Sequence, residues 1–186
     1  MRKRSLRRAI QPCELPASSF LLNAHERGGF TDCYVTEMDG SISQSAFIEA
    51  FYTTPLFKVE RAILKWIAAK PSTDSEAKQL AMGATETFAA WQVERRSADQ
   101  LLLADFTGRT RSWLMVSPAD SPGGASRTQL YFGSGVGSRS ENRGSKDSMG
   151  VVFRALLGFH KLYSRLLLGA ARSRLTANQR ASATMD

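Results

Sequence analysis

The side chains of this chain that can perform acid–base chemistry are few. Only two histidines occur, His25 and His160. His25 stands in a polar stretch just before Gly28-Gly29, where a surface residue is the simplest interpretation. His160 falls on a long amphipathic segment, about 40° around a helix from Leu156, so it borders the apolar stripe. It can serve there as a general base or hydrogen-bond donor at a cavity edge, or it can be a hydrogen-bonded histidine at the margin of a core.

Tyr163 follows His160 by one helical turn and can either present its hydroxyl to a ligand or pack. Sequence spacing places no nucleophile or carboxylate beside His160, and no metal-ligand spacing of Cys, His, Asp and Glu occurs. Glu86, Glu94 and Asp105 fall in strand candidates, where outward-facing solvated carboxylates are the simplest interpretation. The sequence therefore implies no catalytic residue, no metal and no cofactor.

Gly133-Ser134-Gly135-Val136-Gly137 is a glycine-rich run that superficially resembles a phosphate-binding loop. It lacks the G-x-G-x-x-G and G-x-x-x-x-G-K spacings, and no helix pattern begins directly after it. Because the run follows a strand candidate, we expect its glycines to permit a bend or bulge where a sheet curls over a helix.

Cys13 and Cys33 are too few and too loosely spaced to predict a disulfide framework or a zinc site. We expect reduced thiols in a cytoplasmic protein. No apolar run approaches the roughly 18 residues needed to span a bilayer. The basic start is followed by no apolar core of a signal peptide, although it is also compatible with an organellar transit peptide.

Aromatic side chains recur at alternating positions of successive strand candidates. With one methionine, they can line a concave, mostly apolar pocket that faces the last helix. The alternative is that the same side chains fill a close-packed core. The candidate ligand-binding residues are Trp91, Trp113, Met115, Phe132, Phe159, His160 and Tyr163.

The elements that must position these residues follow from the apolar patterns. Residues 30–38 alternate with a period of two and predict a strand. Three helix starts follow: a capping box of Ser41 with Gln44, a cap at Thr54 before Pro55, and a capping box of Thr73 with Glu76. Strand candidates then lie around Trp91 and at 101–106, 112–116 and 128–132, with a hairpin turn at Thr107-Gly108.

Residues 148–174 predict a long amphipathic helix. One stripe is apolar and the opposite side carries Arg154, Lys161, Arg165 and Arg172. Such a stripe must be buried, and antiparallel strands are its natural partner. The predicted fold class is α+β, a curved antiparallel sheet wrapped around a long C-terminal helix in the order β-α-α-(α)-β-β-β-β-α. The predicted stripe consists of Val152, Leu156, Phe159, Tyr163, Leu166, Leu167 and Ala170.

The chain resembles a bacterial family related to the START/Bet v 1-like helix-grip superfamily, which includes polyketide cyclase and dehydrase-type proteins. Two stretches carry the resemblance: residues 50–60, Ala-Phe-Tyr-Thr-Thr-Pro-Leu-Phe-Lys-Val-Glu, and residues 157–162, Leu-Gly-Phe-His-Lys-Leu. The resemblance implies a curved sheet around the C-terminal helix, with an apolar small molecule bound between them. The expected division is a basic arm and lead-in (1–27), a helix-grip domain (28–174) and a frayed tail (175–186).

The formal charge of +8 lies at the two ends of the chain. Residues 1–10 carry five basic and no acidic side chains, and residues 139–186 carry nine basic and three acidic ones. The middle of the chain has a net charge of −3. The ends are typical of solvated tails and a solvent-exposed helix face, although they can also contact polyanions or an anionic membrane surface weakly.

Three functions stay open from the sequence. The first is binding of a hydrophobic or lipid-like small molecule between the sheet and the C-terminal helix. The second is a cyclase- or dehydrase-type enzyme on the same scaffold, with His160 or Tyr163 as the acid or base. The third is an interaction module that uses its basic ends on membrane, nucleic acid or protein.

We predict that Phe159→Asp unfolds the domain, because an unpaired charge in the buried stripe costs several kcal/mol. Circular dichroism of the purified variant would measure this. A folded variant with the wild-type melting temperature would show that the stripe is misassigned.

Overall fold

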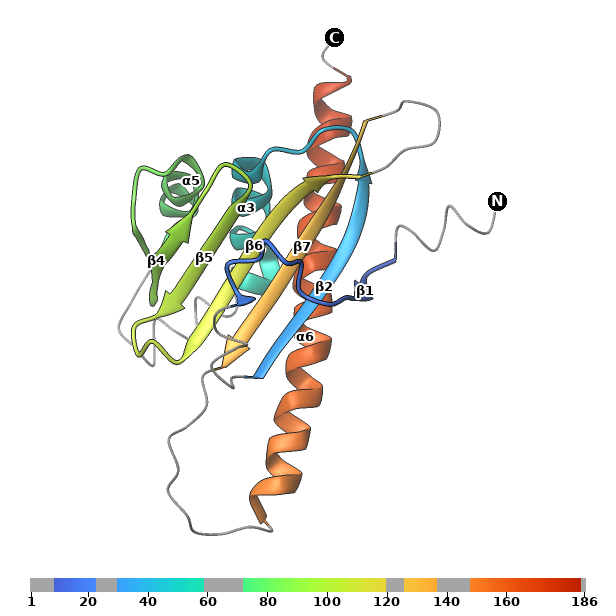
Figure 1. The fold of residues 1–186 in the computed structure, drawn as a ribbon. Coiled ribbons are helices and arrows are strands. Elements are labelled where there is room, and N and C mark those ends of the chain that lie inside the picture. Colours follow the sequence, from blue (N-terminus) through green and yellow to red (C-terminus); the bar gives the residue numbers. More distant parts are fainter. Residues whose placement is uncertain (1–8, 23–29, 59–71, 120–125, 137–147, 185–186) are drawn as a thin grey trace.

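The computed structural model describes residues 9–22, 30–58, 72–119, 126–136 and 148–184, with the side chains of 148–160 left outside the description. The predicted order and fold class are confirmed: a curved antiparallel sheet lies against a long C-terminal helix (Figure 1). The sheet has seven strands in the order β1-β2-β7-β6-β5-β4-β3. The strands are β1 Gln11–Pro12, β2 Phe30–Asp39, β3 Thr87–Phe88, β4 Trp91–Arg96, β5 Gln100–Asp105, β6 Thr110–Pro118 and β7 Arg127–Val136.

Helices α3 (Gln44–Tyr52), α5 (Asp74–Met82) and α6 (Ser148–Ser182) lie on one face of the sheet. The N-terminal segment crosses the opposite face (Figure 1). Residues 9–22 of this segment are called the N-terminal strap below. The described part of the molecule therefore has three layers, and both faces of the central strands are covered.

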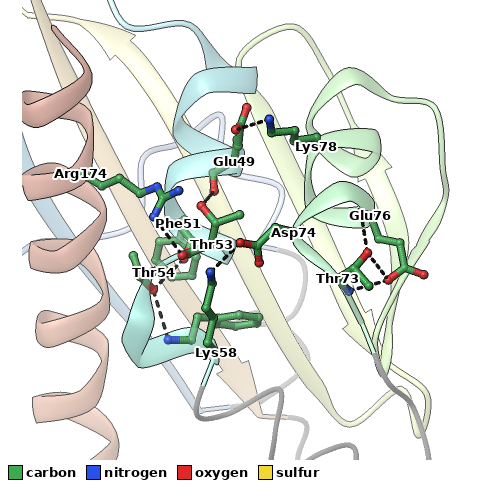
Figure 2. Close-up of polar contacts among 11 residues, drawn as sticks. Glu49, Phe51, Thr53, Thr54, Lys58, Thr73, Asp74, Glu76, Lys78 and Arg174 are labelled. Carbon is green, nitrogen blue, oxygen red and sulfur yellow. Dashed lines mark hydrogen bonds and ion pairs between the residues drawn. The ribbon is translucent and has the colours of Figure 1, made fainter. Parts of the chain in front are cut away.

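Local capping signals start the helices. Thr73 and Glu76 form the predicted capping box at α5 (Figure 2). The helix ends at Gly83, which is in the left-handed conformation. The predicted box at Ser41 is wrong: Ser43 caps α3, and its Oγ accepts from the Ala46 N–H. Gln44 is instead buried, and its side-chain amide donates to the carbonyl of Leu114 on β6.

Thr54 begins the next helical segment, as predicted, and its Oγ1 accepts from the Phe57 N–H at 3.2 Å (Figure 2). The apolar face predicted for this segment continues into residues 59–71, which lie outside the described residues. Arg174 of α6 donates to the carbonyl of Thr53 at 3.2 Å. This bond ties the end of α3 to the C-terminal helix.

The pairing register decides which residues face the helices. Tyr34 of β2 and Leu114 of β6 both stand opposite Phe132 of β7. These three side chains belong to the core on the helix side. In α3 the Phe51 ring lies 4.8 Å from the Phe132 ring, centroid to centroid. The aromatic side chains of α3 therefore pack directly on the central strands.

The apolar stripe of α6 is confirmed in part. Leu167, which was predicted on the stripe, is buried against the helix-side core, and Tyr163 packs on that core while partly buried. Other residues buried there were not predicted on the stripe: Leu168, Ala171 and Leu175. The side chains of Val152, Leu156 and Phe159 lie outside the described residues. Leu166, which was predicted on the stripe, is 52% exposed. The helix also continues through Ser182 rather than ending near 174, so most of the predicted frayed tail is helical.

The N-terminal strap, predicted as part of an arm and lead-in, packs on the outer face of the sheet. Leu21 is fully buried there. The Gln100 side chain fixes the strap: its Oε1 accepts from the Phe20 N–H at 3.1 Å and from Trp113 Nε1 at 2.9 Å. Its Nε2 donates to the carbonyl of Ser18. A single buried amide thus joins the strap, β5 and β6.

The glycines of β7 form no bulge, because β7 pairs with β2 and β6 in unbroken register through Gly133 and Gly135. Gly133 instead provides room. A Cβ on it would stand 2.9 Å from Leu21 Cδ2 and 2.9 Å from Trp113 Cε3. Only a residue without a side chain allows both groups to cover the strand. The irregularity in the sheet lies in β4, between Val93 and Arg95.

We predict that Gly133→Ala lowers the free energy of unfolding by about 1–3 kcal/mol, because the new methyl group overpacks the outer face. Urea denaturation would measure the change. Trp113→Leu provides the partner for a double-mutant cycle, and the Gly133→Ala cost should shrink in that background. Equal costs in the two backgrounds would contradict the proposed contact.

Candidate functional site

The structure does not bring the predicted ligand-binding residues together. Phe132 belongs to the helix-side core, and Trp91 and Tyr163 pack against that core while partly buried. Trp113 and Met115 lie on the opposite face, under the N-terminal strap. Their placement corrects the prediction of one common pocket wall. The side chains of Phe159 and His160 lie outside the described residues, as does His25.

The prediction of one pocket wall was wrong because of the way residues of neighbouring strands pair. Trp113 pairs with Gly133 and Met115 pairs with Tyr131, whereas Phe132 pairs with Leu114. Alternation within each strand was visible in the sequence. The relative parity of two strands, however, depends on which residues pair, and a shift of one residue reverses the face.

Two of the three carboxylates considered as acids from the sequence have structural roles. Asp105 organises the β5–β6 turn at the predicted hairpin, where its Oδ1 accepts from the Arg109 N–H at 2.9 Å. Glu94 forms a two-point ion pair with Arg111, at 2.7 and 3.2 Å. Glu86 is exposed and lies outside the strands.

A row of polar side chains crosses the helix side of the sheet, and sequence reasoning missed it. Asp32 of β2 stands opposite Ser134 of β7, which stands opposite Ser112 of β6. Ser134 Oγ donates to Asp32 Oδ1 at 2.5 Å, and the Ser112 and Tyr52 hydroxyls lie 3.1 Å apart. Ser112 and Ser134 are buried. Buried hydroxyls require partners, so this row is a fixed hydrogen-bonded arrangement.

Tyr34 extends the polar row toward α6. Its ring is buried, and Arg165 lies over it with Cζ 5.5 Å from the ring centroid. Burial, with the charge and hydrogen bond of Asp32, raises the pKa of Tyr34 to about 12 against the opposing charge of Arg165. The phenol is therefore protonated near neutral pH and acts as a donor or a packing group, not as a base.

A groove of about 480 Å³ lies between β2 and α6, and Pro12 and Cys13 of the strap close its third side. We call it the β2–α6 groove. It combines an apolar surface, two cations and the Asp32–Tyr34 pair, and Leu162 in it is 56% exposed. Its volume is within the range of small-molecule sites. The sheet and helix residues that line it include Phe30, Asp32, Tyr34, Lys161, Leu162 and Arg165.

Two further grooves flank the C-terminal half of α6. One, of about 640 Å³, separates residues 37–39 of β2 from residues 172–183. The other, of about 620 Å³, lies between residues 41–46 and 175–183. Across the first, Gln179 Nε2 donates to the Asp39 carbonyl and Arg172 Nη1 donates to Thr36 Oγ1. These bonds fasten the helix to the sheet edge. We therefore interpret both grooves as boundaries between packed elements of the fold.

The described residues contain no group of three His, Cys, Asp or Glu side chains able to hold a metal ion. Within the same residues, no helix combines the length and the apolarity that crossing a bilayer requires. Comparison of the chain with family models, curated proteins and solved structures gives no match. The function must therefore be argued from the chemistry of the groove.

We predict that Tyr34→Phe reduces the pH dependence of stability between pH 10 and 12. The phenol has a pKa of about 12 in the folded chain and about 10 in an unfolded one. Its contribution to stability is therefore fully present below pH 10 and is lost as the pH rises toward 12.

The free energy of unfolding, measured by urea denaturation from pH 9 to 12, should fall less steeply in the variant than in the wild type. Tyr131, whose pKa burial also raises, is common to both proteins and cancels in the comparison. Parallel curves would contradict the buried position of the Tyr34 hydroxyl.

Proposed function

We propose that the chain binds a lipid-like small molecule with an acidic end group in the β2–α6 groove. The observation that carries the proposal is that apolar and cationic side chains share one groove between the sheet and the C-terminal helix. Lys161, Leu162 and Arg165 from α6 face Phe30 and Tyr34 from β2. This pattern suits a molecule that has an alkyl or ring portion and an anionic head.

The charges of the groove support an anionic rather than a cationic head. Lys161 and Arg165 contribute two positive charges, against one negative charge from Asp32. One oxygen of that carboxylate already accepts the Ser134 hydroxyl. The Arg165 guanidinium lies over the Tyr34 ring, with Cζ 5.5 Å from the ring centroid. A guanidinium carries several N–H donors and can bind a carboxylate through two parallel hydrogen bonds.

The apolar part of the ligand would cover Leu162 and Phe30. Leu162 is more than half exposed, and covering it gains roughly 25 cal/mol for each Å² of apolar surface removed from water. Membership of the START/Bet v 1-like helix-grip superfamily is part of the same proposal. Its support is the seven-stranded antiparallel sheet with the C-terminal helix lying against it.

The described contacts favour binding over catalysis on this scaffold. Tyr163, one of the two residues that the sequence suggested as acid or base, packs against the apolar helix-side core. The side chain of the other, His160, lies outside the described residues. Tyr34 is held in its protonated form by its raised pKa. A general base near neutral pH needs a pKa near the working pH, and Tyr34 does not meet this requirement.

The test compares a long-chain fatty acid with the corresponding alcohol as probes. We predict that the double charge reversal Lys161→Glu with Arg165→Glu weakens binding of the acid about tenfold or more and changes binding of the alcohol little. Leu162→Asp should weaken both probes. Isothermal titration calorimetry would supply the dissociation constants, and native mass spectrometry would show any molecule retained on purification.

Arg109→Glu is a matched control, since Arg109 is exposed in the β5–β6 turn and lies outside the groove lining. It should bind the acid like the wild type. If the acid bound the double variant and this control with equal affinity, the groove would not be the binding site.

A further inference from the structure

We propose that Cys13 and Cys33 form a reversible redox site that reacts with a low-molecular-weight disulfide and fastens the N-terminal strap to β2. Their spacing of 20 residues predicted no disulfide, yet the two sulfurs lie 3.0 Å apart. The inference does not depend on the proposed ligand.

The backbone holds the two cysteines in position. Gln11 pairs with Val35 and Pro12 with Tyr34, so the antiparallel register places Cys13 opposite Cys33. The Cys13 N–H donates to the Cys33 carbonyl at 3.0 Å, which continues the pairing by one residue. Opposed residues in such a ladder have Cα atoms roughly 4.5–5.5 Å apart, within the range that a disulfide spans. The bond can therefore close with little movement of the backbone.

The surroundings give the two thiols different roles. Cys33 is only 5% exposed and packs in the outer-face core with Leu21 and Trp113. Both cysteines line the β2–α6 groove, and Cys13 is the more exposed of the two. The contact with Cys33 lowers the pKa of Cys13, because a Cys33 S–H stabilises the Cys13 thiolate. The same contact, together with burial, raises the pKa of Cys33.

The reaction follows from this asymmetry. The Cys13 thiolate attacks one sulfur of a small disulfide such as glutathione disulfide, which forms a mixed disulfide and releases one glutathione thiolate. Cys33 then loses its proton to solvent and attacks Cys13 Sγ, so the second glutathione thiolate leaves. The protein loses two electrons and two protons, and one glutathione disulfide becomes two glutathione molecules. Excess glutathione reverses both steps.

The new bond would close a loop between the strap and β2. In the reduced protein the strap is held by the Gln100 bonds, by the β1 pairing and by burial of Leu21. A covalent link at Cys13 restricts the unfolded chain and removes one way for the strap to leave the sheet. Oxidation should therefore raise the thermal midpoint by about 5–10 °C.

The experiment incubates the full-length chain at a series of glutathione to glutathione disulfide ratios, blocks free thiols with iodoacetamide and measures intact mass. The expected product is a monomer that has lost two hydrogens and carries no label, and non-reducing peptide mapping should link Cys13 to Cys33. The raised thermal midpoint should disappear on adding dithiothreitol.

Single variants test the order of attack. Cys33→Ala should accumulate a glutathione adduct on Cys13, whereas Cys13→Ala should leave Cys33 largely unmodified because it is buried. The double variant, Cys13→Ala with Cys33→Ala, should show no redox-dependent shift in midpoint. Circular dichroism of each reduced variant would establish that it is folded before it is compared.

Three outcomes would overturn the proposal. One is that both cysteines remain alkylatable in excess glutathione disulfide. Another is a wild-type protein that accumulates the mixed disulfide without the internal bond. The third is a disulfide between two chains in place of one within the chain.

Discussion

Burial of both faces of the central strands is the constraint on which the described structure depends. Each of β2, β6 and β7 sends alternate side chains into two different cores, one under the helices and one under the N-terminal strap. The outer core has a fully buried tryptophan, Trp113, which must be covered and must satisfy its indole N–H. Gln100 accepts the indole N–H of Trp113 and also binds the strap that covers this tryptophan. The strap is thus part of the fold, and it carries Cys13 to the position opposite Cys33.

Local signals predicted the order of elements correctly. The Thr73–Glu76 capping box, the Thr54 cap and the turn at Thr107-Gly108 each depend on residues within a few positions of one another. Short stretches of sequence are therefore enough to predict these features. The apolar stripe of α6 was predicted from the same kind of local pattern, and in the described part of the helix it was right for Leu167 and wrong for Leu166. An error of less than one helical step is enough to move such a residue from the core edge to solvent.

The candidate site was less predictable because it is non-local. Asp32, Ser134 and Ser112 meet only because three strands, distant in sequence, pair in one particular register. Each of them looks like an ordinary polar residue of a strand. The strap escaped prediction for a related reason: β1 has two residues, too few to show a period, and its anchor Gln100 lies 80 residues after Phe20. The same argument applies to the cysteines, whose sequence spacing says nothing about their cross-strand pairing.

The β2–α6 groove lies where the three layers of the molecule meet, and this location explains its mixed chemistry. The sheet supplies an acid and a buried phenol, the helix supplies cations and an exposed leucine, and the strap supplies a wall with a thiol. Asp32 accepts the Ser134 hydroxyl, and Tyr34 is held protonated near neutral pH by its raised pKa. The proposed ligand would meet Lys161, Leu162 and Arg165 on α6 and Phe30 on β2. The exposed leucine and the two cations on the helix side are the features that support the proposal of an amphiphilic ligand. Cys13 belongs to the strap, which forms one wall of the groove. The oxidation state of Cys13 would therefore determine how firmly that wall is held.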